Sequence, residues 1–131
     1  MKKRTLLLGI ISLMIVGILA AGCGDDYDKN VLLIRNGTMN MMPNVPIGKA
    51  FDKFFNKGGS WRSFTSTQNE TIVEFEGKYT LLDTTPSKAL VQFKLTGGKN
   101  FDLQYVALDG EAMDYDERII FMGMVLAAYT P

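Results

Sequence analysis

The sequence predicts an α+β domain: a four-stranded antiparallel meander with one helix before it and one helix after it. Apolar residues recur with helical spacing from Ile47 to Phe55. Apolar and polar residues then alternate with period two over 71–79, 89–95 and 101–107. An uncharged apolar run closes the chain after a helix-capping pattern. Since such a sheet has one apolar face, we expect the helices to cover that face.

The first helix is expected to begin near Pro46, which suits a first helical turn, and to end before Gly58-Gly59. Four strands are expected over 61–67, 71–79, 89–95 and 101–107, with turn residues between them. The alternation in 71–79 places Glu74 and Glu76 on the face opposite the apolar side chains, where we expect a solvated row.

The last helix is expected to start at Asp114, whose side chain forms a capping box with Glu117. Residues 119–129 carry no charge, and they are too few to span a bilayer. We expect this helix to pack beside the first one on the same sheet face, with Gly123, Ala127 and Ala128 allowing close approach. The alternative is an interface through residues 119–129 with a partner or with a second copy in a homodimer.

Two segments precede the first expected helix. The β-prone run Val31–Arg35 is expected to form an edge strand or to pack beneath that helix. The stretch Thr38–Pro46 contains three methionines and is expected to form an irregular loop, in which Met41 and Met42 are candidate partner contacts.

The N-terminus has the three parts of a secretory signal: the basic cluster Lys2-Lys3-Arg4, the apolar run Leu6–Leu19, and the small residues Ala20-Ala21-Gly22 before Cys23. This last stretch resembles the lipobox of bacterial lipoproteins, although Ala20 stands where Leu is most frequent. The resemblance implies cleavage between Gly22 and Cys23 and acylation of Cys23. An uncleaved membrane anchor is the alternative. The expected organisation is a signal peptide over 1–22, a lipidated cysteine and solvated tether over 23–30, and one domain over 31–131.

Composition narrows the possible functions of this chain. The 14 basic residues balance the 14 acidic ones, and removal of the signal leaves 11 against 14, a net charge of −3, which disfavours nucleic acid as a partner. The chain has no histidine and one cysteine, which excludes serine–histidine and cysteine–histidine catalysis and ordinary zinc, haem or iron–sulfur sites. We therefore expect no catalytic set, no metal site and no cofactor.

The remaining candidate site residues are aromatic, basic or acidic. Trp61 beside Arg62 could form a recognition anchor of the kind found at interface hot spots, although a single Trp in a small domain is more often core. Glu74 and Glu76 could form the carboxylate pair of a hydrolase, but two residues apart on one strand they fit a solvated row better.

Three segments, namely Ile34–Thr38, Val45–Phe55 and Val73–Gly77, together with Trp61, resemble a group of small uncharacterised bacterial lipoproteins over residues 31–95. The order of tether, helix, Trp and meander is also similar in layout to the lipoproteins of outer-membrane β-barrel assembly and to β-lactamase-inhibitor-like domains. Those relatives usually have two helices before the strands, whereas one is expected here, so none of their contacts is transferred to this chain.

These observations favour a lipid-anchored, non-catalytic binding or scaffolding module on the extracytoplasmic side of the cell membrane or outer membrane, with an envelope protein as partner. The alternative is an inhibitor or ligand-binding lipoprotein that contacts an envelope enzyme through the sheet edge and the Met39–Pro46 loop. A carboxylate-based cell-wall hydrolase is a third hypothesis.

Overall fold

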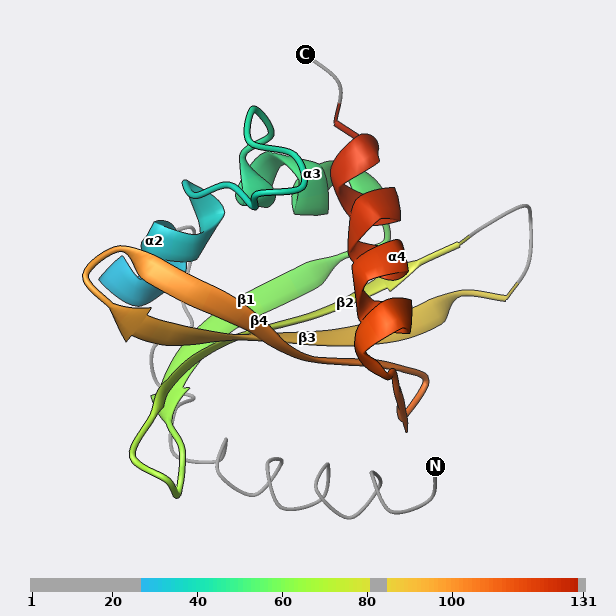
Figure 1. Ribbon diagram of the computed structural model, residues 1–131. Coiled ribbons are helices and arrows are strands. Elements are labelled where there is room, and N and C mark those ends of the chain that lie inside the picture. The colour runs from blue at the N-terminus through green and yellow to red at the C-terminus, as the bar shows by residue number, and fades with distance from the viewer. Residues whose placement is uncertain (1–26, 81–84, 130–131) are drawn as a thin grey trace.

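The computed structural model describes residues 27–80 and 85–129, in which two helices precede one sheet and a third helix follows it (Figure 1). The elements in chain order are α2 (Lys29–Arg35), α3 (Ile47–Phe54), β1 (Gly59–Thr65), β2 (Thr71–Tyr79), β3 (Ser87–Gly97), β4 (Asn100–Leu108), β5 (Glu111–Ala112) and α4 (Tyr115–Ala127). Their strands form an antiparallel sheet in the order β1-β2-β3-β4-β5. The predicted α+β class and antiparallel meander are confirmed. The predicted count of four strands with one helix on either side is wrong.

The strands with clear alternation lie where the sequence predicts them. β2 has the predicted bounds, and β3 and β4 extend one or two residues beyond theirs at each end. β1 lies two residues earlier than predicted at both ends. The unpredicted β5 has two residues, which is too short for any periodicity, and it pairs with Ala107 and Leu108.

The segment Val31–Arg35, for which the sequence predicts either an edge strand or packing beneath the following helix, is itself helical because its start is capped. The Asp28 carboxylate accepts a hydrogen bond from the backbone N–H of Val31 at 2.9 Å, and Val31 and Ile34 then point together into the core. Lys29 and Asn30, which the sequence places in the tether, belong to this helix. The predicted signal peptide and the predicted cleavage and lipidation site at Gly22 and Cys23 lie outside the described residues.

All three described helices lie on one side of the sheet and bury its apolar face (Figure 1). α4 packs beside α3, and the Phe54 and Phe121 rings meet edge-on at 5.9 Å. The predicted capping box of Asp114 and Glu117 is present. Gly123 does not serve a close approach, however, because an added Cβ there would meet nothing within 4 Å.

Candidate functional site

Trp61 lies on β1, on the sheet face that the helices cover. Its ring centroid is 4.9 Å from that of Phe75 and 5.1 Å from that of Phe51, so the aromatic core holds the indole on one side. The residue is nevertheless only half-buried. Trp61 therefore belongs partly to the core and partly to the surface, which combines the two alternatives that the sequence leaves open.

The exposed side of Trp61 borders a small pocket with a volume of about 120 Å³. The pocket is formed by residues from the start of the described chain, α3, β1 and β2. Its lining is mainly aromatic and consists of Tyr27, Phe51, Asp52, Phe55, Gly59, Trp61 and Phe75. Sequence reasoning missed Tyr27 and Asp52 as site residues, because no local pattern assigns either of them a role and only the fold brings them to Trp61.

Arg35 lies in the last turn of α2 and contacts three residues that line this pocket. Its guanidinium donates two hydrogen bonds to the Asp52 carboxylate, at 3.1 and 2.8 Å, and lies 4.6 Å from the Tyr27 ring centroid and 5.6 Å from that of Trp61. The hydrogen bonds to Asp52 raise the pKa of Arg35, and burial partly opposes this shift. Of the aromatic lining residues, Phe51, Phe55 and Phe75 are at most 4% exposed, so the pocket presents the half-buried Trp61 and the exposed Tyr27 beside an already paired carboxylate.

The close packing of α2 and α3 depends on Gly48. A Cβ at this position would lie 2.8 Å from the Cβ of Arg35, so a larger residue would push the two helices apart. Because Arg35 reaches Asp52 across this contact, Gly48 helps to set the geometry of the pocket wall.

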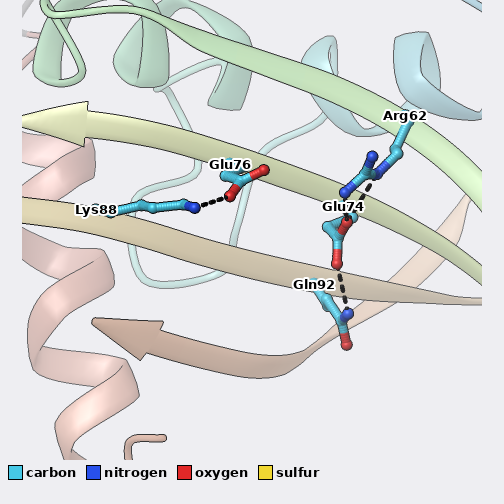
Figure 2. Close-up of polar contacts among 5 residues, drawn as sticks. All are labelled: Arg62, Glu74, Glu76, Lys88 and Gln92. Carbon is cyan, nitrogen blue, oxygen red and sulfur yellow. Dashed lines mark hydrogen bonds and ion pairs between the residues drawn. The ribbon is translucent and has the colours of Figure 1, made fainter. Parts of the chain in front are cut away.

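Arg62 projects from the opposite face of the sheet, as neighbouring residues on a strand must. There its Nε and Nη2 atoms contact Glu74 Oε1 at 2.8 and 2.7 Å, and Gln92 Nε2 donates to Glu74 Oε2 at 2.8 Å (Figure 2). The three residues are cross-strand neighbours on β1, β2 and β3. Trp61 and Arg62 therefore do not form one contact surface.

The expectation that Glu74 and Glu76 form a solvated row is wrong for Glu74, which is 1% exposed. Burial is tolerated because Arg62 and Gln92 supply donors to both of its carboxylate oxygens. Glu76 is partly exposed and pairs with Lys88 at 2.6 Å (Figure 2). Each carboxylate thus has a structural partner, and that of Glu74 has no surface with which to contact a substrate in this conformation.

The two methionines proposed as contacts lie in the loop between α2 and α3, where Met39 and Met42 form an isolated β-bridge. Met41 is exposed, whereas Met42 is partly buried and packs against the core. Of the pair, Met41 is the more exposed, at 37%.

Among residues 27–80 and 85–129, no helix is long and apolar enough to cross a membrane. The same residues contain no group of three or more histidine, cysteine, aspartate or glutamate side chains that could hold a metal ion. Comparisons with protein-family models, with curated protein sequences and with solved structures gave no match.

Proposed function

We propose that this chain is a membrane-anchored bacterial lipoprotein that acts as a non-catalytic binding or scaffolding module of the cell envelope. The anchor is Cys23, acylated after removal of residues 1–22, as its lipobox-like sequence implies. The observation that carries the binding role is the half-buried Trp61 at the aromatic pocket. Large aromatic side chains at partly exposed, rigid positions are the residues that dominate interface energies.

The pocket is supported in a way that suits recognition. Arg35 fixes both Tyr27 and Asp52, so a ligand would meet an ordered wall and would lose little side-chain freedom on binding. Tyr27 is also only four residues after Cys23. Four extended residues reach about 14 Å, so lipidation would hold the pocket close to the membrane surface.

Two described helices precede the meander, as in the layout of the outer-membrane-assembly lipoproteins and β-lactamase-inhibitor-like domains named above, but α4 follows it and departs from that layout. Because the proposed anchor at Cys23 would place the chain in the envelope, we propose that the partner is an envelope protein at the extracytoplasmic side of the cell membrane or outer membrane.

The test is a mild crosslink of the full-length chain in its native envelope, followed by affinity capture and mass spectrometry. Four forms are compared: the unchanged chain, Cys23→Ala without the acylation site, Tyr27→Ala at the pocket, and Leu32→Ala as the control. Tyr27 and Leu32 are 37% and 40% exposed, so both truncations shorten a side chain with a similar exposed fraction.

We expect one stoichiometric envelope protein with the unchanged chain and with Leu32→Ala, and much less of it with Tyr27→Ala and Cys23→Ala. Recovery that is equal in all four forms would contradict a role for the pocket and the anchor. Recovery of no protein from a correctly acylated chain would contradict the proposed scaffolding function.

A second copy is a further proposed partner, through the outer side of α4. Ile120 and Met124 lie one turn apart there and are 68% and 42% exposed. If α4 forms a homodimer, sedimentation of the purified protein should show a dimer that Met124→Asp converts to a monomer. Met41→Asp is the matched control, because Met41 is 37% exposed in the loop between α2 and α3 rather than on α4, and it should leave the dimer intact.

A further inference from the structure

A second hollow lies where β1 begins, β2 ends and β3 begins. Its volume is about 400 Å³, within the range of small-ligand sites. Its lining contains three lysines, three glycines and two other polar residues, namely Lys57, Gly58, Gly59, Ser60, Glu76, Gly77, Lys78 and Lys88. Gly59 also lines the aromatic pocket, so the two hollows lie on either side of the start of β1.

Two of the glycines at this hollow pack against the core, and a third has an unusual backbone conformation. Gly59 and Gly77 are cross-strand partners, and a Cβ on either one would lie 2.5 Å from the Phe75 ring. Gly58 has a φ of +109°, a conformation that other residues rarely adopt. Gly58 and Gly59 are exposed, and a Cβ at Gly58 would meet nothing within 4 Å, so a ligand can closely approach the backbone there, beside Lys57.

The charges around the hollow are not balanced. Lys88 pairs with Glu76, whereas Lys57 and Lys78 have no carboxylate within 4 Å among the described residues. Lys78 and Lys88 also stand directly opposite each other on β2 and β3. Like charges in that position destabilise a sheet, and an anion between them would relieve the repulsion.

We propose that this hollow binds the phosphate group of a phosphate ester through Lys57, Lys78 and Lys88. Lysine ammonium groups bind phosphate as point charges and need no fixed fork geometry, which suits flexible side chains around an open hollow. Such a phosphate can belong to an anionic phospholipid headgroup or to a soluble ester. This inference concerns a different hollow from the proposed protein-binding pocket and does not depend on it.

The test follows backbone amide resonances of the full acylated chain in phosphatidylcholine nanodiscs during titration with inorganic phosphate or glycerol 3-phosphate. A parallel sample uses phosphatidylglycerol nanodiscs with no added phosphate. The site variant is Lys57→Gln/Lys78→Gln, and Lys49→Gln/Lys53→Gln on α3 is the control with the same change in charge. All four lysines are exposed, so both double variants should fold.

We expect saturable shifts at Gly58, Gly59 and Gly77, with affinity weakened about tenfold or more in the site variant and little in the control. Shifts that also appear in phosphatidylglycerol nanodiscs alone would identify the membrane as the phosphate source. Shifts with soluble esters only would identify a soluble ligand. The absence of shifts in both arms, or equal affinities in the site and control variants, would overturn the proposal.

Discussion

Replacing Arg62 with Met should expose how strongly the sheet depends on the buried carboxylate of Glu74. The change removes both charged donors to Glu74 Oε1 and leaves the hydrogen bond from Gln92 to a side chain with 0% exposure. Breaking a fully buried ion pair costs about 3–5 kcal/mol. Because the Arg62 side chain is 34% exposed, water already screens part of this interaction, and we expect a loss of about 2–3 kcal/mol in the free energy of unfolding.

The assay is urea unfolding followed by fluorescence of Trp61, the single tryptophan of the chain. Glu74→Gln is then added to both backgrounds. In the Arg62→Met background it removes the uncompensated charge and gives the unpartnered Gln92 Oε1 a donor, so it should restore stability. In the unchanged background it should reduce stability. A loss below about 0.5 kcal/mol for Arg62→Met, or the same sign for Glu74→Gln in both backgrounds, would refute the buried-pair reasoning.

Two further predictions concern packing and pH. Gly77→Ala places a Cβ 2.5 Å from the buried Phe75 ring and should destabilise the folded state by about 1–3 kcal/mol. Gly123→Ala instead fills open space in a helix and should stabilise the folded state by about 0.5–1 kcal/mol. Thermal melts in which the two variants show the reverse order of stability would contradict both assignments. Burial raises the pKa of the Tyr79 phenol, and a hydrogen bond with Ser87 partly offsets this effect. The folded state therefore favours the neutral phenol, so stability should be retained below the ordinary pKa of about 10 and fall as pH rises above it. Urea midpoints at pH 8.5 and 10.5 should differ less in Tyr79→Phe than in the unchanged chain, and equal differences would contradict this assignment.

The strands could be predicted because each carries its own periodic signal. In β2, the apolar residues Val73, Phe75 and Tyr79 alternate with polar ones, and the structure places these three in the core. The helices α3 and α4 likewise show their apolar spacing or their capping box in the sequence. In these elements the periodicity of the sequence agrees with the packing in the fold, so a short stretch of sequence is sufficient to predict each of them.

The helix α2 was not predicted because two local signals conflict. The β-branched residues Val31 and Ile34 favour a strand, whereas Asp28 favours a helix start three residues before Val31. The cap prevails because helical spacing also buries Val31 and Ile34 together against the sheet. The burial of Glu74 escaped prediction for a related reason: alternation gives the face on which a side chain lies, but not which neighbouring strands supply its partners.

The aromatic pocket could not be predicted from any single segment, because it depends on how the start of the domain is fixed to the sheet. Asp28 caps α2 and also accepts a hydrogen bond from the Ser63 hydroxyl on β1 at 2.7 Å. The same residue therefore starts the helix and attaches it beside Trp61, and Tyr27 is the next residue toward Cys23. If Cys23 is acylated as proposed, no more than four residues separate the lipid from the pocket wall, so the anchor would set the height of the pocket above the membrane. A partner that reaches Trp61 would then have to present its contact surface close to the membrane.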